Sequence, residues 1–287
     1  MTYEIDIVSR ITEKFPELSD AEKRVAQLVL DDIAASARAS IGQLAQEAGV
    51  SQATITRFAK SVNCRDVRDL KVRLAQSLAV GQRFIHEAPD LDGINGIYEG
   101  IKNVLEMNRK VVDEAAIKQA VGWLSQARQT LVVGMGGGST IMAQELQFRL
   151  FRLGFVVSSY NDGLLGRMVA SSVSAKDVFV ALSLTGFTPE VVESAEIAKH
   201  YGAKVIAITS KGSPLAKVAD LTLGLVTQET DFIYKPTASR YAMMALIDVV
   251  ATELALAHKR QVRDQLRRLK LTLDAHRGGT DRQPLGD

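Results

Sequence analysis

The spacing of apolar residues changes along the chain and predicts two kinds of structure. Residues 1–80 show several helical patterns and no run that is typical of a strand. Between residues 130 and 226, short β-branched apolar runs alternate with helical segments, and residues 236–276 are helical again. This order predicts an all-α domain followed by an α/β domain.

The most specific local pattern is a helix, a tight turn and a second helix between residues 41 and 62. On each helix four apolar residues recur at i, i+3, i+4 and i+7, which places them on one face. These two stripes are Ile41, Leu44, Ala45 and Ala48, then Ile55, Phe58, Ala59 and Val62. Gly49 permits a left-handed turn between the helices, and the Ser51 hydroxyl is placed to cap the second one. We therefore expect the two stripes to bury against each other.

The outward face of the second helix has side chains that suit the major groove of DNA. Its expected members are Ser51, Gln52, Ala53, Thr54, Thr56, Arg57 and Lys60. In that groove Gln can pair with adenine, Arg can pair with guanine, and Ala or Thr methyl groups can contact thymine. Residues 51–73 hold six Lys or Arg against two Asp, whereas the first 32 residues hold eight acids against four bases. A helical hairpin that binds no nucleic acid is the alternative interpretation.

Five apolar runs in the second domain predict a parallel sheet. They lie at residues 130–133, 155–157, 178–182, 205–208 and 221–226. Helical segments separate most of them, which is typical of βαβ units covered by helices on both faces. Ligands of such sheets bind where strands end and helices begin.

The first of two segments suited to that position is VVGMGGGST, residues 132–140. Gly136 and Gly138 allow close approach of the backbone to a ligand, and Ser139 or Thr140 can cap the next helix and reach the ligand. The glycine spacing departs from G-x-G-x-x-G, and no acidic residue ends a second strand about 20 residues on. A dinucleotide site is therefore not indicated.

The second segment is SLTGFTPE, which begins at Ser183 and joins a predicted strand to a helix. Ser183, Thr185 and Thr188 supply hydroxyls, Gly186 removes a side chain from the turn, and Thr188 is the expected N-cap. Free N–H groups and the dipole at a helix start suit the oxygens of a phosphate monoester. An ordinary capped turn uses the same residue types.

Both domains resemble those of RpiR-type bacterial transcription regulators. The first matches through IGQLAQEAGVSQATITRFAKSVNCRDVRDLKVRLA, with Asn63 where the family usually has glycine. Residues of about 115–258 resemble the sugar isomerase (SIS) domain that follows it, through VVGMGGGS, ALSLTGFTPE, AKHYGAKVIAITS, SPLAKVAD and PTASRYAMMALIDVV. The resemblance implies an all-α helix-turn-helix domain followed by an α/β SIS domain with a parallel sheet flanked by helices.

The resemblance also implies a phosphate site. Ser183, Thr185 and Thr188 would hold the phosphate of a sugar phosphate, together with Ser139 from the first loop. Thr185 replaces the middle Ser of the family's S-x-S-G-x-T pattern. The first loop is longer than usual in the family by one residue, which leaves Gly138 and Ser139 as alternatives for the phosphate-facing position.

Glu229 is the candidate for an enzymatic role, because SIS enzymes commonly place a carboxylate after the last strand. It could act as the base of an aldose–ketose isomerisation. A solvated loop residue or a subunit contact explains Glu229 equally well. Further candidates for contacts with the sugar are Asn161, Asp162, Lys235 and Arg240. No evident acid–base pair, metal cluster or activated nucleophile accompanies them, so we expect no catalysis, no metal and no cofactor.

Composition adds limits on location and domain boundaries. The single cysteine, Cys64, cannot form an internal disulfide, which indicates a reducing cytoplasm. The N-terminus lacks the basic start of a signal peptide, and charged residues interrupt the longest apolar stretch, so we expect no membrane association. We expect a DNA-binding domain at 1–80, a linker at 81–105, the SIS domain at 106–276 and a flexible tail at 277–287.

These patterns predict a sequence-specific DNA-binding transcriptional regulator of carbohydrate metabolism. Its expected partners are operator DNA, a phosphorylated sugar or sugar acid as effector, and further copies of itself in a homodimer or homotetramer. The apolar face of residues 241–256 and the basic segment 259–270 are candidate subunit interfaces. The alternatives are a SIS sugar-phosphate isomerase with an accessory helical domain, and a sugar-phosphate-binding protein that regulates a partner enzyme by contact.

Overall fold

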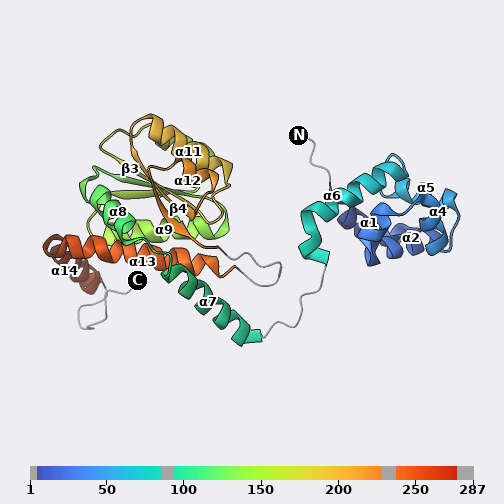
Figure 1. Cartoon of the computed structure of the whole chain (residues 1–287), viewed down its shortest axis with the longest axis horizontal. Coiled ribbons are helices and arrows are strands. Elements are labelled where there is room, and N and C mark those ends of the chain that lie inside the picture. Colours follow the sequence, from blue (N-terminus) through green and yellow to red (C-terminus); the bar gives the residue numbers. More distant parts are fainter. Residues whose placement is uncertain (1–4, 86–92, 228–236, 277–287) are drawn as a thin grey trace. The chain divides into compact units, whose positions relative to one another are not determined.

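The chain folds into two compact units with separate hydrophobic cores. The computed structural model describes residues 5–85, 93–227 and 237–276 (Figure 1). The first unit is helical and its last described residue is Ile85, and the second is α/β and its first described residue is Gly93. The segment expected to be a linker, 81–105, includes the last turn of one helix and most of the next one. The expected tail lies outside the described residues.

The helical unit packs short helices around one core. They are α1 (Ile7–Lys14), the 3-10 helix η1 (Phe15–Glu17), α2 (Asp20–Asp31), α3 (Ile33–Arg38), α4 (Ile41–Glu47), α5 (Gln52–Ser61) and α6 (Val67–Ile85). Helix α4 begins with a capping box, in which the Ser40 hydroxyl accepts from the Gln43 N–H at 3.2 Å and the Gln43 side chain accepts from the Ser40 N–H at 2.7 Å. Both predicted apolar stripes join the core, with Phe58 fully buried and Ile41 half-buried at the margin.

The second unit contains a five-stranded parallel sheet between two layers of helices, as predicted. Its strands are β1 (Thr130–Gly134), β2 (Val157–Tyr160), β3 (Val178–Ser183), β4 (Lys204–Ser210) and β5 (Leu221–Leu225), in the order β2-β1-β3-β4-β5. Its helices are α7 (Gly93–Arg109), α8 (Glu114–Gln126), α9 (Gly137–Arg152), α10 (Gly163–Ala170), α11 (Pro189–His200), α12 (Pro214–Val218), α13 (Ser239–Ala257) and α14 (Lys259–His276).

Alternate residues of each central strand enter different cores. In β3, Val180 and Leu182 pack with α7, α8, α9 and α13, whereas Phe179 and Ala181 pack with α10, α11 and α12. Figure 1 shows the two helical layers on opposite faces of the sheet. Strands buried on both faces read as continuous apolar runs, which explains why the sequence revealed them.

The strand order reverses at β1, and this reversal sets the position of the candidate ligand site. The chain passes from β1 outward to β2 and then returns to β3 on the other side of β1. Gly134 at the end of β1 pairs in register with Leu182 near the end of β3. The loops that follow these strands therefore leave the same edge of the sheet on either side of a switch point, where open α/β sheets bind ligands.

Strand β2 differs from its predicted position, because it begins at Val157 instead of Phe155. Gly154 adopts a φ of 91° and ends α9, and the Phe155 N–H donates to the Leu150 carbonyl at 3.1 Å. Phe155 thus completes the end of a helix, and the polar edge strand starts only after it.

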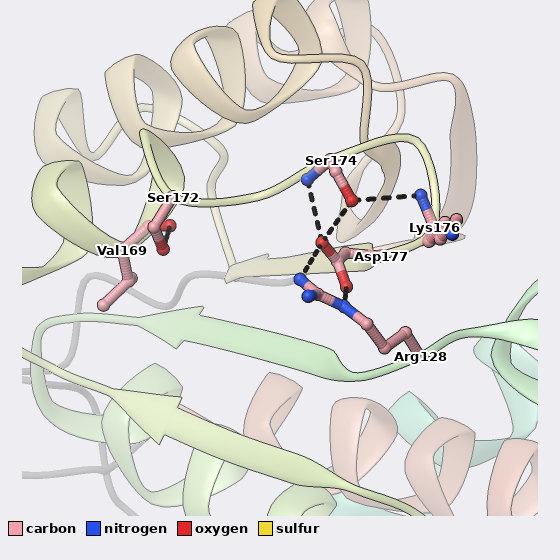
Figure 2. A network of polar contacts seen from close by, with 6 residues as sticks. All are labelled: Arg128, Val169, Ser172, Ser174, Lys176 and Asp177. Carbon is pink, nitrogen blue, oxygen red and sulfur yellow. Dashed lines mark hydrogen bonds and ion pairs between the residues drawn. The ribbon is translucent and has the colours of Figure 1, made fainter.

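A buried carboxylate ties two loops together at the opposite, amino-terminal edge of the sheet (Figure 2). Asp177 is 1% exposed and accepts two bonds from the Arg128 guanidinium, at 2.9 and 2.8 Å. The N–H and hydroxyl of Ser174 donate to the same carboxylate at 2.8 and 2.9 Å. Burial alone would raise the pKa of Asp177, but the bonds from Arg128 and Ser174 outweigh it and hold that pKa below its usual range.

Among the described residues, no single helix has both the length and the apolarity of a membrane span. Helices α13 and α14 reach both only when taken together across a bend of 107°.

Candidate nucleic-acid interface and anion site

The turn between α4 and α5 has the predicted geometry. Gly49 adopts a φ of 62°, and the Val50 N–H donates to the Ala45 carbonyl at 2.9 Å, which closes the end of α4. The Ser51 hydroxyl accepts from the Thr54 N–H at 3.2 Å and caps α5. Asn63, at the end of α5, adopts a φ of 62°, which confirms that it takes the left-handed turn.

The outward face of α5 agrees with the prediction except at Thr54. Gln52, Ala53, Arg57 and Lys60 are exposed, as is Ser51, and Thr56 is half-buried. Thr54 is 4% exposed, and its hydroxyl lies 3.0 Å from the Ser51 hydroxyl. The expectation that Thr54 is exposed is wrong, because this position faces the inner side of the helix and its hydroxyl joins the cap.

Fewer cations are available near α5 than the sequence count suggests. Arg65 and Arg73 pair with Asp69 at 3.2 and 3.3 Å. Hydrogen bonds from the backbone and side chain of Arg65, with the charge of Arg73, lower the pKa of Asp69 to about 2. The other four cations of residues 51–73 make no ion pair with a described carboxylate: Arg57, Lys60, Arg68 and Lys71. These four can therefore meet DNA phosphates without first breaking a pair.

The loop after β3 holds its hydroxyls and amides in a compact turn. Ser183 is 2% exposed, and its hydroxyl accepts from the Gly186 N–H at 3.0 Å and lies 3.1 Å from the Thr188 hydroxyl. Thr188 is the N-cap residue of α11 by position, with Pro189 after it, as predicted. The predicted capping bond is wrong, because the Thr188 hydroxyl contacts Ser183 and accepts no bond from the first turn. Within the described chain, the N–H groups of Thr185, Thr188 and Glu190 donate no hydrogen bond.

Position 186 requires glycine for two reasons: its backbone is left-handed, and a side chain there would collide with its neighbours. Its φ is 74°, and a β-carbon would lie 2.1 Å from the Ser213 hydroxyl and 2.6 Å from the Thr209 hydroxyl. The Leu215 N–H at the start of α12 donates to the Gly186 carbonyl at 3.2 Å. The buried pair Thr209, near the end of β4, and Ser213, the N-cap of α12, thus supports the loop from below, a role that no pattern within the loop predicts.

The loop after β1 starts its helix earlier than predicted. Gly136 is the N-cap of α9 with a φ of 75°, and Ser139 lies inside the helix and is 5% exposed. The expectation that Ser139 or Thr140 caps the helix is wrong, because two successive glycines with positive φ, Gly136 and Gly137, turn the chain into the helix first. The N–H groups of Gly137 and Gly138 donate no bond to any described residue.

The two loops meet at Gly138. A β-carbon on Gly138 would lie 3.8 Å from both Leu184 in the second loop and Arg240 on α13. The Arg240 guanidinium lies over the Tyr241 ring at 5.0 Å and has no carboxylate partner among the described residues. The start of α9 therefore lies against the loop after β3, with the Cβ of Arg240 beside it.

Known proteins match the chain along nearly its whole length. Residues 5–81 match the helix-turn-helix domain of the rpiR family, and residues 123–253 match the SIS domain. The HTH-type transcriptional regulator HexR of Pseudomonas aeruginosa is 36% identical over 273 residues, which cover 93% of this chain and 95% of that protein. The chain belongs to the rpiR family. HexR of Escherichia coli K12 is 35% identical over 278 residues, which cover 95% of this chain and 96% of that protein.

The solved structure of NanR from Vibrio vulnificus, in complex with ManNAc-6P, has the same fold as this rpiR-family protein. It matches with a TM-score of 0.60 at 23% identity over 93% of this chain and 97% of that one. The full-length relatives are transcriptional regulators, which confirms the prediction of a regulator rather than an enzyme.

Glu229 and Lys235 lie outside the described residues, and the Asp162 carboxylate caps α10 by accepting from the Leu165 N–H at 2.7 Å.

Proposed function

We propose that this rpiR-family regulator binds a phosphorylated sugar or sugar acid between the loops after β1 and β3. The observation that carries the proposal is a group of N–H donors at the starts of α9 and α11 that bond to no described residue, in Gly137, Gly138, Thr188 and Glu190. Such donors and the positive ends of the helix dipoles favour a dianion. The complex of NanR with ManNAc-6P supports the effector class, because it is a sugar phosphate bound by a protein of this fold.

The hydroxyls of Ser183, Thr185 and Thr188 complete this proposed site, with Ser139, Gly136 and Gly186 shaping its backbone. Ser183 is buried and already bonded within the loop, so it orients Gly186 and Thr188 as well as facing the ligand. Thr185 is exposed and free to donate to a phosphate oxygen. Arg240 lies beside Gly138, where it is placed to meet a second anionic or hydroxyl group of the effector.

The proposed DNA contact is the exposed face of α5. Gln52 and Arg57 carry the groups that pair with bases, and Lys60 carries a charge for the phosphate backbone. One such helix contacts only a few base pairs, so the proposal includes a homodimer or homotetramer that presents paired helices to an operator. The proposal places the protein in the cytoplasm, where DNA and phosphorylated sugars occur together.

A thermal-shift panel tests the effector site. The midpoint of unfolding should rise with one or more sugar phosphates and stay unchanged with the matching unphosphorylated sugars, because a ligand at 100 times its Kd stabilises the folded state by about 2.7 kcal/mol. The Ser183→Ala variant should lose this shift. The matched control is Ser36→Ala, which removes another buried serine hydroxyl, 3% exposed, from α3 of the helical unit. An equal shift with unphosphorylated sugars would contradict the site.

A further inference from the structure

Helix α14 turns sharply away from α13, and its most buried residue among those described lies in its first turn. It follows α13 after a bend of 107° at His258. The His258 ring bonds to the Ser125 hydroxyl at 2.7 Å and lies edge-on to Phe155. Val262, in the first turn, is 6% exposed, whereas Leu271 further along is 67% exposed. The helix is thus fixed at one end and leaves apolar surface open beyond it.

This open surface forms a groove of about 660 Å³ between the end of α13 and α14. Its floor is apolar and contains Leu256, Val262, Leu266 and Leu271. Leu256 and Leu271 are 51% and 67% exposed. Both line the same depression, so they form one apolar patch and are not isolated surface leucines. A contiguous apolar depression with a polar rim is typical of a binding surface.

The rim of the groove carries one sign of charge. Lys259, Arg263, Arg267 and Lys270 line it at i, i+4, i+8 and i+11, and so form one stripe along α14. Lys270 pairs with Asp274, and the other three have no carboxylate partner in the described part of the chain. No described carboxylate lines the groove. The groove therefore offers an apolar floor beside unneutralised positive charge.

These two properties together restrict the occupant. A second copy that contacts this groove about a two-fold axis would bring each cation stripe against the same stripe, which is repulsive. DNA would satisfy the cations but would leave the leucines unburied, because phosphate contacts need no apolar floor. An amphipathic helix with acidic flanks satisfies both, since its apolar face covers the leucines and its acids meet the stripe. We propose that the α13–α14 groove binds an acidic amphipathic helix of a partner protein.

The groove also sets the length of the segment that fits it. The cation stripe runs from Lys259 to Lys270, a rise of roughly 16 Å at 1.5 Å per residue. A helix of about three turns covers this length. Binding falls with rising salt, because the rim is exposed to solvent and its charges are screened.

The experiment uses the full chain and a fluorescent helical peptide with leucines at i, i+4 and i+7 and glutamates on both sides of them. Its control peptide has glutamine at every glutamate position. The groove variant is Arg263→Glu with Arg267→Glu. The matched control variant is Arg260→Glu with Arg268→Glu, which makes the same charge change on the same helix at exposed positions outside the groove.

The wild-type chain should bind the acidic peptide at least tenfold more tightly than the neutral one. The groove variant should lose about tenfold or more in affinity, and the control variant should stay within about threefold of wild type. Absence of binding to the wild type, or equal losses in both variants, would overturn the proposal. Sedimentation and DNA titration of the same variants complete the test: selective loss of self-association or of DNA affinity in the groove variant would assign the surface to a second copy or to nucleic acid.

Discussion

The loop after β3 gives the sharpest test of how the anion site is built, through the substitution Gly186→Ala. Gly186 has a φ of 74°, and holding alanine in the left-handed region costs about 1–2 kcal/mol. The new methyl group would also lie 2.1 Å from the Ser213 hydroxyl, so the loop must shift, and overpacking of this kind costs about 1–3 kcal/mol. The expected loss of stability is the sum, about 2–5 kcal/mol.

Gly212→Ala separates the two contributions. Gly212 has a φ of 78° but nothing lies within 4 Å of its added β-carbon, so this variant should carry only the conformational cost. Urea unfolding can be followed through Trp123, the single tryptophan, which packs against the core of the α/β unit. Gly186→Ala should be less stable than Gly212→Ala by about 1–3 kcal/mol and should alone lose phosphate affinity. Equal stability and equal affinity of the two variants would refute the packing argument.

Three further predictions concern other parts of the molecule. Lys60→Ala, at the proposed phosphate contact, should weaken DNA binding and reduce the slope of log affinity against log salt by about 1, whereas Arg38→Ala, exposed on α3, should leave the slope unchanged in fluorescence-anisotropy titrations. Asp177→Asn should cost about 1.5–3 kcal/mol at pH 7, because it removes the charge of a buried carboxylate that accepts from Arg128 and Ser174. The folded pKa of Asp177 is lowered, so its contribution is present above the unfolded value near 3.9 and is lost as the pH falls through the folded value. Urea melts should show the gap between wild type and variant closing at acid pH, and a gap constant with pH would contradict this linkage. Asn63→Ala should cost about 1–2 kcal/mol by thermal denaturation, because alanine resists the left-handed φ of 62°, and no loss would contradict that reason.

Local patterns predicted the parts of the fold that local physics decides. The i, i+3, i+4, i+7 stripes that include Phe58 are buried as expected, and Gly49 and Ser51 close the turn and cap the helix. The central strands were evident because both of their faces are buried. The edge strand β2 was misplaced, since Phe155 serves the end of α9, and periodicity does not distinguish that role from a strand.

The details of the sites depended on which of several available partners each polar group bonds to, and spacing along the chain does not decide this. Thr209 and Ser213 support Gly186 from another strand and helix, and no spacing within the loop reveals them. The Thr188 hydroxyl bonds to Ser183 instead of capping its helix, a choice between two nearby partners that sequence alone leaves open. Two of the cations counted near α5, Arg65 and Arg73, form ion pairs with Asp69. The residue types of a site were therefore predictable, whereas their free or bonded state was not.

The central claim is that an anion held at the starts of α9 and α11 changes the affinity of α5 for DNA. The most direct measurement is the affinity of the full chain for a duplex that it selects from a random pool, with and without the sugar phosphate that stabilises it in the thermal-shift panel. A coupling of roughly 1–3 kcal/mol predicts a change of about 5- to 150-fold, absent in Ser183→Ala although that variant binds DNA normally without ligand. Unchanged DNA affinity of the wild type at saturating sugar phosphate would contradict the account.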